Sequence, residues 1–291
     1  MRNRLNGRPS ILITGATDGL GFAVARVLAR QGAHLILHGR NAEKLDQVAT
    51  TLRSEILRSE IPNSSVETEV ADFESLRQVD QMATRILEKH HALQVLVNNA
   101  GIGAGFANRQ RALTVDGLEA RFAVNYLAGY HLTKRLLPLL KAAAPARVVN
   151  IASLAQHAID FENVQLEREF DSLRAYGQSK LAQIMHAFDL GAELEDVGVT
   201  VNALHPSSLM PTNMVLEGWT RTIDTLEAGA GATVRLVTGA DVSGLTGQFF
   251  NKLVIGEPDQ QAFDSSARAQ LREVSDRLIA TALAHPVNAN L

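Results

Sequence analysis

The stretch SILITGATDGLGFAVARVLARQG, from Ser10 to Gly32, contains the residues that decide the fold. Its first five residues are an apolar, β-branched run that is too short for a helix and predicts a buried strand. Gly15, Gly19 and Gly21 follow, and apolar residues then recur at helical spacing until Gly32, which suits a helix C-cap. Glycines between a strand and a helix let the backbone approach a pyrophosphate at the positive helix N-terminus, so this stretch predicts phosphate binding. The alternative is a glycine-rich turn that binds nothing, since the spacing differs from the common GxGxxG.

The alternation of strands and helices continues along the chain. Apolar runs at residues 34–38, 65–70, 94–98, 146–153, 199–206 and 247–250 predict six further strands. Helical patterns lie at residues 41–60 behind an Asn41 N-cap, about 73–90, 115–143 with a bend or an end near Pro138, 172–194, about 222–237 and 265–284. Helices of crossover length between strands indicate right-handed βαβ units and a parallel sheet covered on both faces. No linker or repeat interrupts the pattern, which predicts a single domain over residues 1–291.

Composition excludes several classes of protein. The 291 residues are 46% apolar and 20% charged, which suits a globular protein with a sizeable core, and the net charge of −3 offers no basic footprint for nucleic acid or an anionic membrane. The absence of cysteine excludes disulfides and cysteine-based metal sites. The nine histidines show no HExxH or other metal-ligand spacing, so we expect no metal. The polar opening residues lack the apolar core of a signal peptide or a membrane span, so we expect a cytoplasmic protein.

A tyrosine and a lysine four positions apart, Tyr176 and Lys180, lie on the helix predicted at residues 172–194. Side chains at this spacing lie one above the other on one helical face. The unperturbed pKa of a phenol is about 10, and a cation one turn away favours its ionised form. The pair could therefore move a proton near pH 7, although a tyrosine that merely packs on a lysine stem is the alternative.

Taken together, four motifs resemble the short-chain dehydrogenase/reductase family. They are TGATDGLG at residues 14–21, NNAG at residues 98–101, Ser153 after the fifth strand, and Tyr176 with Lys180. They occur in the family's order and cover roughly residues 9–251, while TVDGLEARFAVN at residues 114–125, the LLPLL run and the long gap between Ser153 and Tyr176 resemble its retinol-dehydrogenase-like branch. The resemblance implies an α/β fold with one doubly wound (Rossmann) domain. Its sheet would have seven mostly parallel strands in the order 3-2-1-4-5-6-7, with an N-terminal cofactor-binding half and a C-terminal catalytic half.

The resemblance also implies catalytic roles for four residues. Tyr176 would be the general acid in carbonyl reduction and the base in alcohol oxidation. Lys180 would lower the phenol pKa and hold the nicotinamide ribose. Ser153 would donate a hydrogen bond to the substrate oxygen, and Asn125 would anchor a water beside Lys180. The alternatives are a turn cap for Ser153 and a mid-helix polar contact for Asn125.

The residues that the resemblance places on the cofactor lie at the ends of several strands. In the glycine turn they are Gly15, Thr17, Asp18, Gly19, Leu20 and Gly21; beyond it they are Arg40, Asp72, Asn98, Ala100, Gly101, Pro206 and Thr212, together with Tyr176 and Lys180. Residues 98–101 would pass beside the adenine, Asp72 would contact it or cap the helix that follows, and Pro206 and Thr212 would lie near the nicotinamide.

The choice between NADP and NAD depends on the end of the second strand. Gly39 stands where the family's NAD-type aspartate would lie, and Arg40 follows it and could pair with a 2′-phosphate. NADP(H) is therefore favoured over NAD(H). Asp18 argues mildly the other way, and Arg40 as a solvated loop charge is the alternative.

Two segments depart from the family pattern. His205-Pro206-Ser207-Ser208 lacks the glycine that usually follows the proline, and residues 156–171 form either a substrate-side rim or lid or a surface insertion. The loops at residues 101–111 and 206–223 contain Ile102, Phe106, Leu209, Met210, Met214 and Trp219, which indicate a small, moderately hydrophobic carbonyl or alcohol substrate. The alternative is that these side chains only pack under the loops.

The family implies a homodimer or homotetramer through the helices that contain Asn125 and Tyr176. Two other functions stay open, a non-catalytic nicotinamide-binding regulator and an NAD-dependent epimerase or dehydratase. The four intact catalytic residues count against the regulator. The glycine spacing and the small C-terminal part count against the epimerase.

Overall fold

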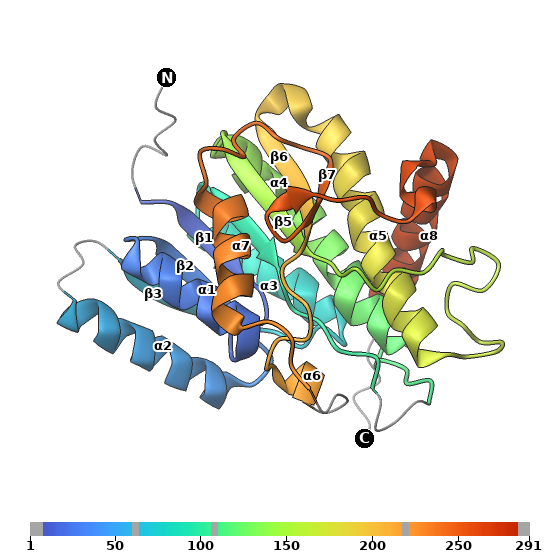
Figure 1. The fold of residues 1–291 in the computed structure, drawn as a ribbon, viewed down its shortest axis with the longest axis horizontal. Coiled ribbons are helices and arrows are strands. Elements are labelled where there is room, and N and C mark those ends of the chain that lie inside the picture. Colours follow the sequence, from blue (N-terminus) through green and yellow to red (C-terminus); the bar gives the residue numbers. More distant parts are fainter. Residues whose placement is uncertain (1–7, 60–63, 106–109, 217–220, 285–291) are drawn as a thin grey trace.

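A computed structural model describes residues 8–59, 64–105, 110–216 and 221–284, and within them eight strands form one sheet (Figure 1). The strands are β1 (Ser10–Ile13), β2 (His34–Gly39), β3 (Ser65–Val70), β4 (Val95–Asn98), β5 (Ala146–Ile151), β6 (Val199–His205), β7 (Gln248–Asn251) and β8 (Val254–Ile255). Their order is 3-2-1-4-5-6-7-8, and the first seven run parallel. The α/β class and the order of the seven predicted strands are confirmed. The eighth strand was missed because two residues paired antiparallel to β7 carry no periodicity.

Alternating side chains of the strands pack against helices on both faces of the sheet. Ile11 and Ile13 of β1 belong to the core that includes α1 (Gly19–Arg30), α2 (Ala42–Arg58) and α7 (Leu226–Thr238). Leu12 belongs to the opposite core, with α3 (Leu76–Lys89), α4 (Ala128–Ala142), α5 (Ser172–Glu193) and α8 (Ser265–Ala284). In Figure 1 the orange α7 lies beside the blue α1, although the two are far apart in sequence. This three-layer arrangement explains why the strands are apolar runs rather than alternating ones.

Strands β2 and β3 are added on one side of β1, and β4 to β8 are added on its other side. The strand order therefore switches between β1 and β4, which pair in parallel. The segments that leave the carboxyl ends of β1, β4, β5 and β6 therefore meet at one edge of the sheet. These segments contain the glycine turn, residues 98–101, Ser153 and Pro206, so the topology gathers the predicted site residues.

Several helices begin later than their sequence patterns predict, for local reasons. Ser75 caps α3 by accepting a hydrogen bond from the Gln78 N–H at 3.4 Å, so the helix starts at Leu76 rather than at residue 73. Thr225 caps α7 in the same way at 3.2 Å. The predicted Asn41 cap of α2 is confirmed, since its side chain accepts from the Lys44 N–H at 2.9 Å.

The long helix predicted at residues 115–143 is the largest difference. A bridge between Leu113 and Glu119 precedes it, a π-helical turn covers Phe122–Leu127, and α4 continues through Pro138 to Ala142. Three short elements were not predicted: the 3₁₀ turns Glu195–Val197 and Gln260–Phe263 and the helix α6 (Asn213–Leu216).

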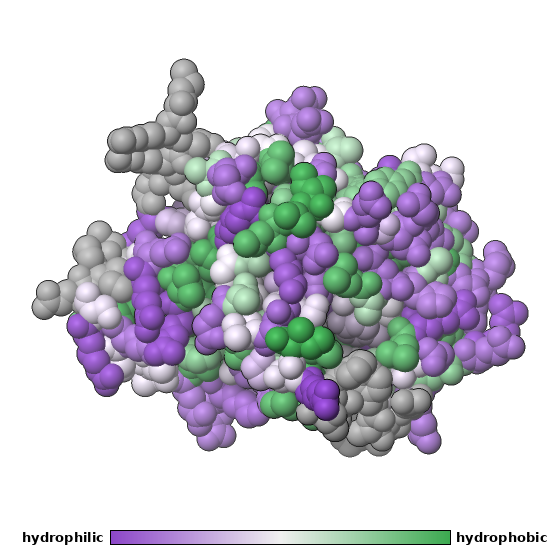
Figure 2. Space-filling model, in the orientation of Figure 1, coloured by the Kyte–Doolittle hydropathy of each residue, from purple (hydrophilic) through white to green (hydrophobic). Residues whose placement is uncertain are grey.

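The β8 edge of the sheet exposes apolar side chains. Leu253, Val254 and Ile255 are each more than half exposed, and Figure 2 shows hydrophobic residues gathered over this part of the surface. Among the described helices, none combines the length and the apolar character needed to span a bilayer.

Candidate active site

Tyr176 and Lys180 lie on one face of α5, as predicted, with the Lys180 Nζ 5.6 Å from the centre of the Tyr176 ring. Lys180 is buried, and its Nζ donates hydrogen bonds to the Ile151 carbonyl at 2.9 Å and to the Gln183 Oε1 at 3.0 Å. Burial disfavours the charged ammonium and lowers the pKa of Lys180 to about 7. The lysine can therefore gain or lose a proton near neutral pH.

The phenol of Tyr176 is hydrogen-bonded to Ser153, which the end of β5 carries to it. Burial raises the pKa of Tyr176, and the hydrogen bond to Ser153 acts in the opposite direction. Burial is the larger of these two effects, and the Lys180 Nζ donates to Ile151 and Gln183, so a lowering of the phenol pKa by Lys180 stays a prediction. The Ser153 Oγ also accepts from the Ala155 N–H at 3.1 Å, so the serine caps its turn as well as contacting Tyr176.

Asn125 lies in the π-helical turn, where the Ala128 N–H bonds back five residues to the Ala123 carbonyl. Such single π-turns often occur at functional sites, because the extra residue redirects a side chain. The buried Asn125 amide accepts from the Ile102 N–H at 2.7 Å and donates to the Ser179 Oγ at 2.9 Å. A Cβ placed on Gly101 would lie 3.1 Å from the Asn125 Oδ1 and 3.7 Å from the Lys180 Nζ, so both polar groups face Gly101.

The glycine turn has the geometry of a phosphate cradle. Gly15 and Gly19 have φ values of +65° and +49°, and a Cβ on Gly21 would lie 2.2 Å from the Gly15 carbonyl oxygen. Only glycine fits these positions. The N-cap residue of α1, Asp18, makes no side-chain cap, so the first N–H groups of the helix, from Gly19 on, are left for a ligand. The residues present therefore fit a pyrophosphate.

The other turn residues divide between the ligand side and the interior. The Leu20 side chain is buried and packs on α7, since it would lie 3.3 Å from a Cβ placed on Gly229. Only the backbone of Leu20 is therefore available to a ligand at the glycine turn. Asp18 is exposed and its carboxylate accepts from the Asn213 Nδ2 at 3.0 Å. The Thr212 methyl would lie 3.1 Å from a Cβ on Gly19, which brings the segment after β6 onto the glycine turn.

Residues 98–101 are fixed to the glycine turn by a threonine that the sequence analysis did not single out. The Thr14 Oγ1 accepts hydrogen bonds from the N–H groups of Asn99 and Ala100, both at 2.9 Å. The Asn98 side chain points elsewhere, donating to Thr133 at 3.0 Å and to Asn150 at 2.9 Å. These bonds hold β4 to α4 and β5, while a cofactor contact of Asn98 stays a prediction.

A second residue that the sequence analysis missed is His38 of β2, whose side chain is hydrogen-bonded to the backbone of the glycine turn. Its Nδ1 accepts from the Gly15 N–H at 3.3 Å, so the Nε2 carries the proton that is shared with the Ala71 carbonyl at 3.0 Å. Burial lowers the pKa of His38 to about 4, and its ring stacks on Phe73 with centroids 4.2 Å apart. The only sequence signal was a histidine inside an apolar strand.

Asp72 and Arg40, which are predicted to contact the adenosine part of the cofactor, follow β3 and β2. The half-buried Asp72 carboxylate accepts from the Glu74 N–H at 3.0 Å, so it holds the turn before α3, whose N-cap is Ser75. Arg40 follows β2 with an exposed side chain, 3.8 Å from the Glu74 carboxylate. A Cβ on Gly39 would lie only 2.4 Å from the Thr17 methyl, which disfavours an aspartate there.

The turn after β6 is built around His205 rather than around a glycine. The His205 Nδ1 accepts from the Leu154 N–H at 3.3 Å, and its Nε2 lies 3.1 Å from the Ser208 Oγ. Burial lowers the pKa of His205 to about 4. The buried Pro206 follows, so His205 connects this turn to the loop of Ser153. No sequence signal marked His205 for this contact.

The segment at residues 156–171 is anchored at several points. Ile159 exchanges two hydrogen bonds with the Gln261 side chain, at 2.6 and 3.0 Å, and Leu166 is fully buried. The segment also crosses α5 beside Tyr176, because a Cβ on Gly177 would lie 2.9 Å from the His157 Cβ. It therefore forms a rim next to Tyr176. Phe106 and Trp219, two of the apolar residues predicted to line the substrate side, lie outside the described residues.

Comparisons with known proteins show the family of the chain. The family model described as short chain dehydrogenase matches residues 9–222. Retinol dehydrogenase 13 of Homo sapiens is 33% identical over 287 residues, which cover 93% of this chain and 84% of that protein. The WW domain-containing oxidoreductase of Danio rerio is 31% identical, over 92% of this chain and 68% of that protein. A solved short chain dehydrogenase from Escherichia coli CFT073, complexed with NADPH, has a TM-score of 0.69 at 26% identity and covers 86% of this chain and 98% of its own.

Proposed function

The chain belongs to the short chain dehydrogenase family, and on this premise we propose that it is an NADP(H)-dependent oxidoreductase that interconverts a carbonyl compound and an alcohol. The observation that carries the proposal is the meeting of Ser153, Tyr176 and Lys180 beside the glycine turn. The retinol-dehydrogenase-like character of the sequence is supported by the relatives it matches.

The cofactor would be held by the glycine turn and by Lys180. The free N–H groups at the start of α1 would take its pyrophosphate, because they carry the positive end of the helix dipole. When bound, the nicotinamide supplies the hydride for reduction or accepts it in oxidation. The His38 and Thr14 contacts would keep the turn in its binding geometry.

The chain's own residues would handle the proton. In reduction, the Tyr176 hydroxyl gives its proton to the substrate oxygen, and Ser153 donates a hydrogen bond to the same oxygen. The pKa of Lys180 is lowered to about 7, so near neutral pH the lysine can supply the proton that returns the Tyr176 phenolate to its phenol form. The Asn125 side chain and the Lys180 Nζ both face Gly101. In this position Asn125 would anchor a water next to Lys180, and that water would pass protons from the solvent to the lysine.

The preference for NADP(H) is supported by the close contact of Gly39 with Thr17 and by the exposed Arg40 beside it. Arg40→Ala should raise the dissociation constant of NADPH by about tenfold, since one charge-assisted hydrogen bond is lost, and leave that of NADH unchanged. Fluorescence titration measures both. Arg30→Ala removes an exposed arginine at the far end of α1, and it should alter neither constant. Equal losses for NADPH and NADH in Arg40→Ala would argue against this assignment.

The substrate would be a small, moderately hydrophobic carbonyl or alcohol, and the name of a relative, retinol dehydrogenase, suggests including retinal among the tests. The decisive variant is Tyr176→Phe, which removes the proton donor and keeps the ring. Turnover should fall by roughly 10² to 10⁴. Tyr130→Phe is the matched control, because the Tyr130 hydroxyl donates to the Asp276 carboxylate of α8 at 2.8 Å.

The screen begins with NADPH and a panel of aldehydes, ketones and alcohols. Native turnover in Tyr176→Phe would refute the mechanism. NADPH binding without turnover of any member of a broad panel would instead favour a non-catalytic regulator. A homodimer or homotetramer and a cytoplasmic location stay predictions, and gel filtration with light scattering measures the first.

A further inference from the structure

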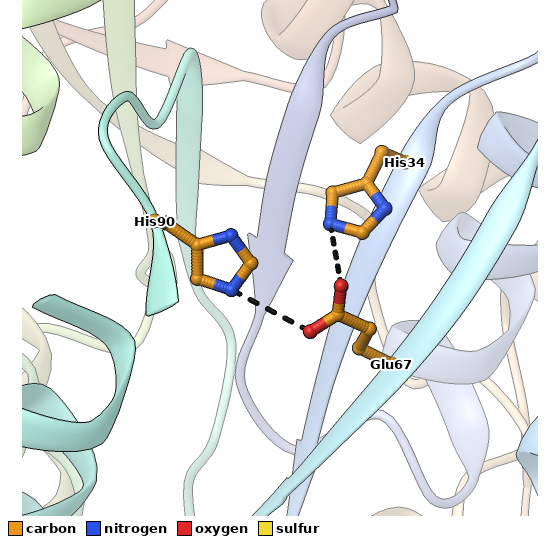
Figure 3. A group of neighbouring side chains, drawn as sticks. All are labelled: His34, Glu67 and His90. Carbon is orange, nitrogen blue, oxygen red and sulfur yellow. Dashed lines mark ion pairs between the residues drawn. The ribbon is translucent and has the colours of Figure 1, made fainter. Parts of the chain in front are cut away.

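Three side chains with metal-binding chemistry meet at the amino ends of the outer strands, opposite the candidate active site. His34 is the first residue of β2, Glu67 lies in β3, and His90 directly follows α3 (Figure 3). One ligand atom of each lies within 4.8 Å of the other two. Far apart in sequence, these residues are brought together only by the pairing of β2 with β3 and the return of α3.

The distances in this cluster match those around a small divalent cation. The His34 Nε2 lies 3.2 Å from the Glu67 Oε1, and the His90 Nε2 lies 3.5 Å from the Glu67 Oε2. Ligands bound at about 2.0–2.1 Å to a tetrahedral zinc are about 3.3 Å apart. The widest separation, at most 4.8 Å, therefore has to close by about 1.5 Å, which rotation of side chains can supply.

The two rings point their Nε2 atoms at the two carboxylate oxygens of Glu67 from different sides, as Figure 3 shows. The His34 Nδ1 is bonded to the Ser65 Oγ at 2.6 Å, which leaves its Nε2 toward Glu67. Metal-binding histidines are held in this way, with one nitrogen on the metal and the other on a hydrogen-bond partner. A nitrogen lone pair beside a carboxylate oxygen is repulsive unless a proton or a cation lies between them.

We propose that His34, Glu67 and His90 bind a zinc ion, with water as the fourth ligand. Two imidazoles and one carboxylate favour zinc over magnesium or calcium, which prefer oxygen ligands. The Glu67 side chain is 44% exposed, so water and metal can reach the site. The ion would join β2 and β3 to the end of α3, and it would stabilise this edge of the sheet without entering the chemistry. This inference does not depend on the proposed oxidoreductase function.

The test uses the full chain freed of metal with a chelator and titrated with ZnCl₂ by calorimetry at pH 7.5. One zinc ion should bind per chain, and a zinc concentration 100 times the dissociation constant should raise the melting temperature by about 5 °C or more. Cobalt, a spectroscopic substitute, should give the visible absorption bands of a tetrahedral site. Absence of both the bands and the calorimetric binding in the native protein would overturn the proposal.

The variants Glu67→Gln and His90→Gln should each weaken zinc binding at least tenfold and remove the thermal shift. His91→Gln is the matched control, since this neighbouring histidine is exposed and lies outside the cluster. The far-ultraviolet circular dichroism spectrum of each variant, recorded without zinc, checks that the fold is retained. If zinc binds Glu67→Gln and His90→Gln as tightly as it binds the native protein, the ion sits elsewhere and the assignment is wrong.

Discussion

Replacing the buried Lys180 by methionine should stabilise the protein at pH 7 while abolishing its activity. Burial moves the pKa of Lys180 from 10.5 to about 7. At about 1.4 kcal/mol per pKa unit, holding the ammonium in the folded interior costs about 4–5 kcal/mol at neutral pH. Methionine removes this cost. It also leaves the Ile151 carbonyl and the Gln183 Oε1 without their hydrogen-bond donor, and these two unpaired acceptors lower the free energy of unfolding by about 2–3 kcal/mol. The expected net gain at pH 7 is about 1–3 kcal/mol.

The pH dependence separates this explanation from ordinary repacking. Between pH 7 and 10.5 the unfolded lysine binds a proton that the folded lysine has lost, so this group makes the native protein more stable as pH rises. Below pH 7 the lysine is charged in both states and its full cost applies. The advantage of Lys180→Met should therefore shrink by about 2 kcal/mol between pH 7 and pH 9.

Urea denaturation of the native protein and of Lys180→Met at pH 7, 8 and 9 measures this difference directly. Gln183→Met is the matched control, because it removes one partner of Lys180 but keeps the titrating group. Its stability should follow the pH slope of the native protein. A difference between Lys180→Met and the native protein that stays constant across this range would refute the assignment of a lowered pKa to Lys180.

Two further variants test other parts of the structure. Gly21→Ala places a Cβ 2.2 Å from the Gly15 carbonyl oxygen, so the turn must open, and the dissociation constant of NADPH should rise at least tenfold in a fluorescence titration; unchanged affinity would contradict the cradle. The pKa of the buried His186 is lowered to about 4, so the native protein should lose up to about 3 kcal/mol of stability as pH falls from 6.5 to 4. His186→Phe should lose correspondingly less in urea titrations, and parallel curves would argue against this account.

The sheet order could be predicted because each strand and each crossover helix has its own local signal, and the handedness of βαβ units then fixes the topology. The starts of the helices depend on which residue caps them. Asp72 and Ser75 are both acceptable N-caps by type, and only the bond from the Gln78 N–H selects Ser75. The π-turn around Asn125 involves one extra residue within a helical pattern, which periodicity does not resolve.

Some residues of the candidate site carry a local signal in the sequence, and others act only through contacts between distant segments. Tyr176, Lys180 and the glycine turn carry local spacing, so the sequence alone marks them. His38 and His205 act through contacts between segments that lie 23 and 51 residues apart. Neither has a neighbour in sequence that reveals its role. The cluster of His34, Glu67 and His90 likewise carries no signal in the sequence, because its members come from three different elements and have no local spacing.

The missing glycine after Pro206 is explained by contacts rather than by backbone freedom. Within the described chain, Ser207 and Ser208 are not among the residues with positive φ, whereas Leu209 has φ +45°, so a glycine is not required directly after the proline. The Asp224 carboxylate holds the turn instead, accepting from the Ser208 N–H at 2.8 Å and pairing with Lys252 at 2.7 Å.

The same turn is connected through His205 to the residue that follows Ser153. Ser208 contacts the His205 Nε2, and the His205 Nδ1 accepts from Leu154, the residue after Ser153. The ion pair of Asp224 and the position of Ser153 are therefore linked by a short chain of hydrogen bonds through one neutral histidine. We therefore expect that a substitution in the segment after β6 alters the hydrogen bond between Ser153 and Tyr176 without touching either residue.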